Sequence, residues 1–182
     1  METYGWLLDI KKCIECRACE TACKQWNGVE TGAGVRYRQV RVTEMGAFPM
    51  VRMQAVTGAC NHCDDAYCMK ACPVKAIWRR SEDGHVLIDR EKCVACRECE
   101  AFCAHKAPQF NTRTGKMEKC TGCFDRVEKG MQPACAELCP TGALRWGKWS
   151  DISKLGSPTM SGFVGLYTKP RLRFINDPYP VR

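Results

Sequence analysis

Residues 93 to 103 read Cys93-Val-Ala-Cys96-Arg-Glu-Cys99-Glu-Ala-Phe-Cys103, so four cysteines are separated by two, two and three residues. The same run, or a version with one gap widened, occurs three more times and accounts for all sixteen cysteines of the chain. In chain order the groups are Cys13, Cys16, Cys19, Cys23; Cys60, Cys63, Cys68, Cys72; Cys93, Cys96, Cys99, Cys103; and Cys120, Cys123, Cys135, Cys139.

This spacing is typical of 4Fe-4S cluster ligands. A C-x2-C-x2-C loop supplies three thiolates from adjacent backbone, and in bacterial two-cluster ferredoxins a cysteine three residues later ligates the neighbouring cluster and precedes proline. Groups one and three keep that spacing but have Lys24 and Ala104 in place of the proline, whereas groups two and four widen one gap and keep the proline. Four groups predict four 4Fe-4S clusters held by all sixteen cysteines.

Two other cysteine chemistries fit the pattern less well. Paired CxxC motifs also suit structural zinc, but a third cysteine after two residues and a fourth after three have no use in a tetrahedral zinc site. Disulfide frameworks belong to small secreted domains, and residues 1–12 have neither the basic n-region nor the apolar h-region of a signal peptide.

The net charge of +8 is compatible with a protein that binds nucleic acid. Four oxidised cubanes with their thiolates contribute a formal charge of about −8, so the basic residues balance the metal sites and we expect no nucleic-acid partner. Five cations lie beside the predicted ligands, where they either ease cluster reduction or are simply solvated: Lys12, Arg17, Lys24, Lys92 and Arg97.

Cysteine makes up 16 of 182 residues, and the remaining apolar residues are scattered in short runs. We therefore expect the clusters to form the core, and folding to require them. No run approaches 18 apolar residues, so no membrane span is expected. Reduced thiols indicate assembly in the cytoplasm. The final site is then the cytoplasm or, by co-export with a signal-bearing partner, the outer face of the cytoplasmic membrane.

Local patterns predict short strands and helical turns joined by long loops. Residues 35–42 alternate apolar and basic side chains, which predicts a half-buried strand with a basic, solvated outer face. The other predicted elements are a strand at 4–10, a helical turn at 18–25, a strand at 50–56 paired with 35–42, a hairpin of 76–80 with 85–89, and a helical turn at 124–130.

An internal repeat organises the chain. Shifted by 80 residues, Asp9, Lys12, Arg17 and Glu20 fall with their cysteines on Asp89, Lys92, Arg97 and Glu100. The fold class predicted is α+β, a duplicated bacterial-type ferredoxin of two-cluster halves. Residues 60–103 form the inner half, and residues 1–59 with 104–147 form the outer half.

Residues 148–182 are predicted to be an extended, partner-binding tail. Its apolar side chains have no evident partner in so small a chain and would offer contact area to another subunit: Phe163, Leu166, Tyr167, Leu172, Phe174, Ile175 and Tyr179.

Three further motifs point to a family. They are Cys60-Asn-His-Cys63, the Ala-Pro-Gln-Phe-Asn stretch at 107–111, and Cys120-Thr-Gly-Cys123-Phe-Asp-Arg-Val. With the order of the four cysteine groups, they resemble the iron-sulfur electron-transfer subunit of the dimethyl sulfoxide reductase family of molybdenum and tungsten oxidoreductases. The resemblance covers about residues 4–147 and continues weakly at residues 167–170.

The resemblance implies a non-catalytic subunit that carries electrons between a molybdenum or tungsten bis-pterin catalytic subunit and a membrane quinone-linked subunit or soluble carrier. It also implies crosswise ligation, in which groups one and four share two clusters and groups two and three share two. The implied sets are Cys13, Cys16, Cys19 with Cys139; Cys120, Cys123, Cys135 with Cys23; Cys60, Cys63, Cys68 with Cys103; and Cys93, Cys96, Cys99 with Cys72.

Ala104-His105 stands where the resembling family usually has Pro-Tyr. His105 either tunes a nearby potential by hydrogen bonding or is an ordinary surface histidine, and the second reading is preferred. His62 lies between two predicted ligands and is given no ligand role.

Two other functions stay open at this point. One is a free polyferredoxin, and the other is the four-cluster partner of a tungsten aldehyde-type or hydrogen-linked complex. The sequence contains no GxGxxG or P-loop motif and no nucleophile–base constellation, so no catalytic residue is predicted.

Overall fold

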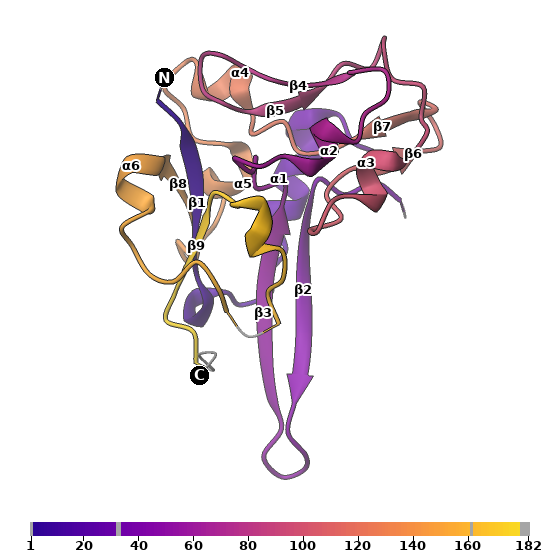
Figure 1. Ribbon diagram of the computed structural model, residues 1–182. Coiled ribbons are helices and arrows are strands. Elements are labelled where there is room, and N and C mark those ends of the chain that lie inside the picture. Colours follow the sequence, from indigo (N-terminus) through magenta and orange to yellow (C-terminus); the bar gives the residue numbers. More distant parts are fainter. Residues whose placement is uncertain (1, 32–33, 161, 179–182) are drawn as a thin grey trace.

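The computed structural model describes residues 2–31, 34–160 and 162–178 (Figure 1). The strands are β1 Tyr4–Asp9, β2 Arg38–Met45, β3 Arg52–Ala59, β4 Ile77–Arg79, β5 Val86–Ile88, β6 Gln109–Asn111, β7 Lys116–Glu118, β8 Leu144–Lys148 and β9 Leu172–Ile175. The helices are α1 Ala18–Asn27, α2 Tyr67–Lys70, α3 Glu98–Ala101, α4 Phe124–Val127, α5 Ala134–Glu137 and α6 Trp149–Ile152, with 3-10 turns η1 Ile10–Lys12 and η2 Leu166–Thr168.

A three-stranded sheet joins the two ends of the described chain. Its order is β8-β1-β9, with β1 antiparallel to β8 and parallel to β9. The central strand β1 is buried from Gly5 to Asp9. Leu8 pairs with Leu144 on one side and with Phe174 on the other, so the first and last strands share one core.

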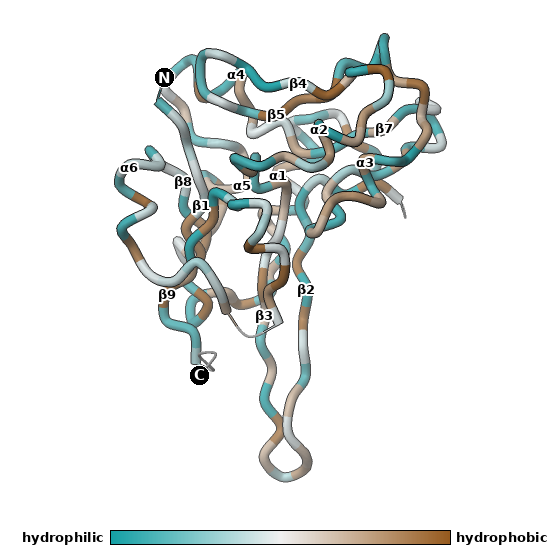
Figure 2. The backbone as a smooth tube through the Cα atoms, viewed as in Figure 1, coloured by the Kyte–Doolittle hydropathy of each residue, from teal (hydrophilic) through white to brown (hydrophobic). Residues whose placement is uncertain are grey.

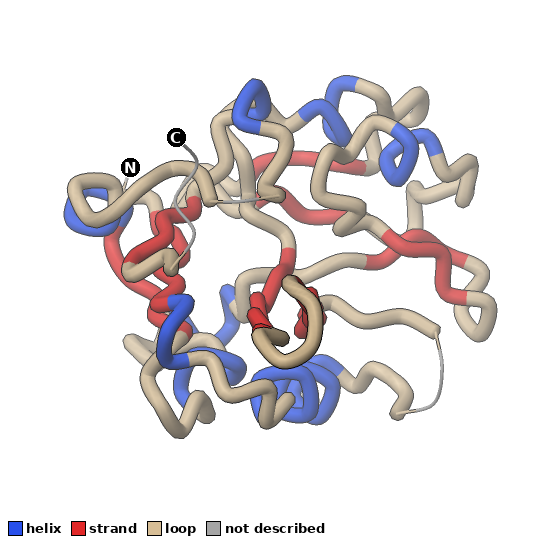
Figure 3. The backbone as a smooth tube through the Cα atoms, turned by 90° about the horizontal axis from the view of Figure 1, so that it is seen from below, coloured by secondary structure: helices blue, strands red, loops and turns tan. Residues whose placement is uncertain are grey.

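The other sheets are two-stranded. Strands β4 and β5 form the hairpin predicted between residues 76 and 89, and β6 pairs with β7. Strands β2 and β3 pair from Arg38↔Ala59 to Met45↔Arg52 and extend well beyond the body of the molecule (Figure 1). Seen from below, this β2–β3 hairpin projects near the middle of the molecule, with helices on both sides (Figure 3).

The tip of the β2–β3 hairpin is apolar. Phe48 is 93% exposed, and Met50 and Val51 are also largely exposed. Figure 2 shows apolar residues close to this tip. A two-stranded ribbon is marginally stable by itself in water. The outer part of the hairpin is therefore stabilised mainly by the backbone hydrogen bonds between β2 and β3.

The predicted elements at 4–10, 18–25, 35–42 with 50–56, and 76–89 are confirmed as β1, α1, β2–β3 and β4–β5. The helical turn at 124–130 is also confirmed, because α4 occupies its first turn and Gly130 follows with φ +72°. One detail is wrong. Of the basic residues expected to be solvated, Arg38 is buried and shares its strand face with the buried Val40, whereas Arg41 lies on the opposite face and is exposed.

Three clusters of buried residues form the core of the described chain, and cysteines lie in each; the smallest is Ala22, Cys123 and Ala134. The largest contains Trp6, Leu8 and Phe174 with five buried cysteines, namely Cys19, Cys23, Cys60, Cys120 and Cys135. The second largest contains Ile77 and Met117 with Cys68, Cys93 and Cys99. The apolar core is thus fuller than the scattered sequence pattern indicated, particularly around β1.

The C-terminal segment is not an extended tail. It forms α6, η2 and β9, and Leu172 and Phe174 are buried in the largest cluster. The expectation that these two side chains lack a partner within the chain is therefore wrong, and Phe163 also packs there, against Phe174. Leu166 and Tyr167 remain exposed, Ile175 is half-buried, and Tyr179 lies outside the described residues.

Within the described ranges, no helix is long and apolar enough to cross a bilayer.

Candidate iron-sulfur centres

The loop of group one is shaped by two left-handed residues. Glu15 and Arg17 have φ +59° and +57°, after which α1 starts at Ala18. Non-glycine residues rarely adopt this conformation. Here it curls the backbone between Cys13 and Cys19.

The loop of group three repeats this geometry 80 residues later. Ala95 and Arg97 have φ +58° and +66°, and α3 starts at Glu98. The internal repeat seen in the sequence is therefore also a repeat of backbone conformation.

Three cavities are each lined by four cysteines. In every case three belong to one sequence group, and the fourth is the last cysteine of another group. The sets are Cys13, Cys16, Cys19 with Cys139; Cys60, Cys63, Cys68 with Cys103; and Cys93, Cys96, Cys99 with Cys72.

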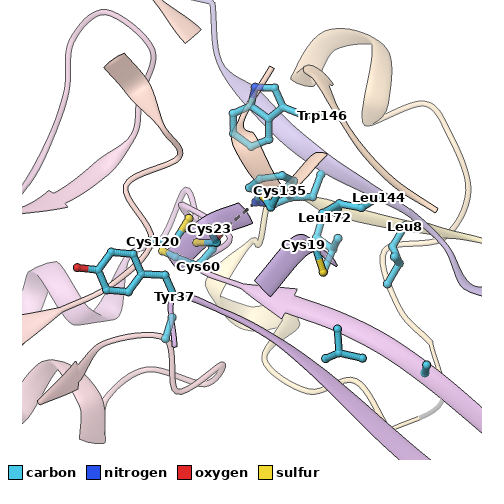
Figure 4. Packing of buried hydrophobic residues seen from close by; sticks show 14 of the residues in the cluster. Leu8, Cys19, Cys23, Tyr37, Cys60, Cys120, Cys135, Leu144, Trp146 and Leu172 are labelled. Carbon is cyan, nitrogen blue, oxygen red and sulfur yellow. Dashed lines mark hydrogen bonds between the residues drawn. The ribbon is translucent and has the colours of Figure 1, made fainter. Parts of the chain in front are cut away.

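The other four cysteines also meet. Burial raises the pKa of Cys23, and the neighbouring thiolates of Cys120, Cys135 and Cys123 raise it further. The side-chain amide of Asn27 lies 3.8 Å from the sulfur of Cys23 and 3.9 Å from that of Cys123. Figure 4 shows Cys23, Cys120 and Cys135 close together beside the base of the β2–β3 hairpin.

The structure thus brings all sixteen cysteines together in four sets of four. Among the described residues, no three His, Cys, Asp or Glu side chains are placed to hold a single metal ion. A 4Fe-4S cubane is a larger core with one thiolate on each iron, and four thiols around a common cavity suit it. That these cysteines are the cluster ligands stays a prediction.

Backbone amides point at the last cysteine of three groups. Ala76 N–H donates to the sulfur of Cys72 at 3.2 Å, Ala107 N–H to Cys103 at 3.4 Å, and Leu144 N–H to Cys139 at 3.4 Å. Hydrogen bonds to cluster sulfurs are among the factors that set the potential, so these loops are built to stabilise negative charge.

Two sites illustrate opposite effects on a thiol. Burial acts to raise the pKa of Cys139, but the Leu144 amide and the Thr141 hydroxyl outweigh it, and the pKa of Cys139 is lowered. Burial raises the pKa of Cys63 to about 12, even though the Thr168 hydroxyl acts to lower it. A thiolate at Cys63 thus depends more on a bound cation than one at Cys139.

The last segment contributes a residue that sequence reasoning missed. The Thr168 hydroxyl lies 3.3 Å from the sulfur of Cys63 and 2.8 Å from the carbonyl of Gly165. His105 Nε2 lies 3.3 Å from the same hydroxyl, and burial lowers the pKa of His105 to about 4. The preferred reading of His105 as a surface histidine is therefore wrong, because it is half-buried and joined through Thr168 to a predicted ligand.

Lys119 is a second residue missed at the sequence level. Lys119 is 4% exposed, and its ammonium donates hydrogen bonds to the backbone carbonyls of Val86 and Cys120. The positive charge of Lys119 acts to lower the pKa of Cys68. Only its position directly before Cys120 could have marked it in the sequence.

His62 is fully buried, and its Nδ1 accepts a hydrogen bond from Val86 N–H at 3.0 Å. Its ring meets the ring of His85 edge-on, with centroids 4.7 Å apart. These contacts are structural ones and give His62 no ligand role.

Comparison with known proteins identifies the type of domain. Residues 51–149 match the family model of the 4Fe-4S dicluster domain. The chain is 39% identical over 181 residues to the probable anaerobic dimethyl sulfoxide reductase chain YnfG of Escherichia coli (strain K12), covering 93% of this chain and 86% of that one.

Two relatives from other systems show the same similarity. The thiosulfate reductase electron transfer subunit PhsB of Salmonella typhi is 38% identical over 146 residues, covering 80% of this chain and 76% of that protein. The formate dehydrogenase-O iron-sulfur subunit of Escherichia coli (strain K12) is 32% identical over 170 residues, covering 86% of this chain and 57% of that protein. The chain therefore belongs to the 4Fe-4S iron-sulfur electron-transfer subunits of the dimethyl sulfoxide reductase family.

Proposed function

We propose that the chain binds four 4Fe-4S clusters crosswise and carries electrons between two partners at opposite ends of that series. The ligand sets proposed are the three that line the cavities and the fourth around Cys23. When bound, the clusters supply one-electron transfer. The protein contributes the order of the sites and their access to the surface.

The single observation that carries this proposal is that one cysteine in each half of the proposed fold is exposed at the surface. Only Cys16 and Cys96 are exposed among the sixteen. Each belongs to a different half of the proposed duplicated fold, Cys16 to the outer half and Cys96 to the inner half.

We propose that the other two sets lie between these ends. Cys60 is close enough to Cys120 for its charge to raise the pKa of that thiol. The inner half therefore adjoins the outer half through the sets of Cys60 and Cys120. This supports a series of four sites with one exposed member at each end.

Apolar side chains accompany both exposed cysteines. Ile14 is 64% exposed beside Cys16, and Val94 is 60% exposed in the equivalent position beside Cys96. Close approach of a partner to either loop would cover these side chains and shorten the distance for electron transfer. We propose that one loop faces a molybdenum or tungsten bis-pterin catalytic subunit and the other a membrane quinone-linked subunit or a soluble carrier.

The names of the relatives support a catalytic partner, since they are a chain of dimethyl sulfoxide reductase and subunits of thiosulfate reductase and formate dehydrogenase. The exposed hairpin tip at Phe48 and the exposed residues Leu166 and Tyr167 offer further contact area. Assembly in the cytoplasm, with the final site there or on the outer face of the cytoplasmic membrane, remains part of the proposal.

Purification from the native cell without oxygen tests the partner. A tagged chain is expected to retain a larger subunit and molybdenum or tungsten together with its iron, and a chain carrying Ile14→Glu and Val94→Glu is expected to release partners. The matched control is Leu155→Glu, at an exposed apolar residue that lines none of the three cysteine cavities. A chain that holds its full iron but elutes alone, without either metal, would instead be a free polyferredoxin.

A further inference from the structure

Arg38 is a buried cation that forms no ion pair with a carboxylate of the described residues. It is 3% exposed at the base of strand β2. Arg38 takes part in none of the ion pairs found between the described residues. Burying a charge without a countercharge is strongly unfavourable, so something else must compensate Arg38.

Its own hydrogen bonds do not provide that compensation. The guanidinium carbon lies 4.2 Å from the centre of the Trp6 ring, and Nη1 lies 3.3 Å from the Thr57 hydroxyl. Nε and Nη2 are buried and have no oxygen or nitrogen acceptor among the described residues. Two donor nitrogens of a permanently charged guanidinium, Nε and Nη2, therefore lie in the interior without such an acceptor.

Cysteine thiols surround this guanidinium. Burial acts to lower the pKa of Arg38, but the charges of Cys135, Cys120, Cys19 and Cys23 outweigh it and raise the pKa. In return, burial raises the pKa of Cys135, and Arg38 is the strongest influence in the opposite direction.

These four thiols belong to two different sets. Cys23, Cys120 and Cys135 are three members of one set, and Cys19 belongs to the set with Cys139. The Thr57 hydroxyl that accepts from Arg38 also lies 3.4 Å from the sulfur of Cys19. Arg38 therefore sits between the two cysteine sets of the outer half.

We propose that Arg38 is the shared countercharge of the two outer iron-sulfur sites and makes both easier to reduce. This inference rests on the proposed function, since it requires clusters in those two sets. Reduction adds negative charge, and a buried cation in surroundings of low dielectric constant favours the more negative state. The set with three neighbouring thiols gains most, and Arg38 acts as a positioning residue rather than a ligand.

The test compares midpoint potentials in the full chain, purified with its partners and titrated under electron-paramagnetic resonance. In Arg38→Met and Arg38→Gln, two of the four potentials are expected to fall. The more affected site changes its reduction equilibrium at least tenfold, which is 59 mV for a one-electron couple. Arg38→Lys keeps the charge and is expected to stay within half of that shift.

Arg41→Met is the matched control, because Arg41 is exposed on the same strand. It is expected to leave all four potentials unchanged. If a neutral variant loses iron, the Arg38→Lys variant distinguishes loss of the positive charge from loss of packing. Retention of both outer clusters in Arg38→Lys but not in Arg38→Gln supports the countercharge, and equal loss in all three variants refutes it in favour of packing alone.

Unchanged potentials in a fully loaded Arg38→Met protein would also refute the inference. That result is distinct from failure of the proposed function, which would appear in the unsubstituted protein as fewer than four clusters.

Discussion

The sharpest test of the site uses two pairs of cysteine substitutions that differ in one member. Cys13→Ala with Cys139→Ala removes two side chains from one cavity, although they are far apart in the sequence. Cys13→Ala with Cys23→Ala removes two side chains from one sequence group, although the structure places them in different sets.

The expected magnitudes follow from these sets. Four cubanes contain about sixteen irons. The first pair leaves only Cys16 and Cys19 at one cavity and keeps the other sets whole, so about four irons and one paramagnetic signal are lost. The second pair leaves three cysteines at each of two sites, so two signals change and up to about eight irons are lost.

The assay is iron analysis together with electron-paramagnetic resonance of the reduced proteins, purified without oxygen. Cys→Ala is preferred to Cys→Ser because alanine offers no oxygen ligand. The crosswise assignment is refuted if the result is reversed, with the pair at Cys13 and Cys139 altering two signals and the pair at Cys13 and Cys23 altering one.

Three further results are expected. Phe174→Ala, at a side chain 2% exposed, is expected to destabilise the folded chain by about 3–5 kcal/mol in a urea titration, whereas Phe48→Ala at the exposed tip is expected to change stability by less than about 0.5 kcal/mol; equal effects would contradict the packing of β9. Gly122→Ala is expected to cost more stability than Gly142→Ala, because both have positive φ but only at Gly122 would the new Cβ meet the His85 ring, at 2.4 Å; equal urea midpoints would show that the ring moves aside. Removal of iron by a chelator is expected to abolish the native circular dichroism, and a cooperative thermal melt of the iron-free chain would speak against clusters as part of the core.

Much of the site could be predicted because its information is local. The spacing from Cys93 to Cys103 states how three sulfurs surround one core, and the structure shows the loop conformation repeated at Arg17 and Arg97. Short-range geometry of this kind can be predicted from the sequence, since the ligand loop is built from adjacent residues.

Arg38 could not be predicted to be buried. Its alternation with Val35 and Tyr37 is the pattern of a half-solvated strand. That alternation changes phase at Gln39, so Arg38 shares a face of β2 with the buried Val40, whereas the exposed Arg41 lies on the opposite face. At the base of the hairpin this face of β2 is covered by Trp6 on β1 and by the cysteine loops. A period of two reports which side chains share a face, but not whether that face meets water.

The sequence by itself determined the cofactor, the number of clusters and the family, because cluster ligation demands particular residues at particular short spacings. Only the tertiary structure decided where the last segment lies and which side chains it brings to the cysteine loops. Strand β9 pairs in parallel with β1 across more than 160 residues of chain, and Thr168 reaches Cys63. Such contacts depend on burial and hydrogen-bond partners supplied by distant segments, and no local pattern in residues 148–182 records them.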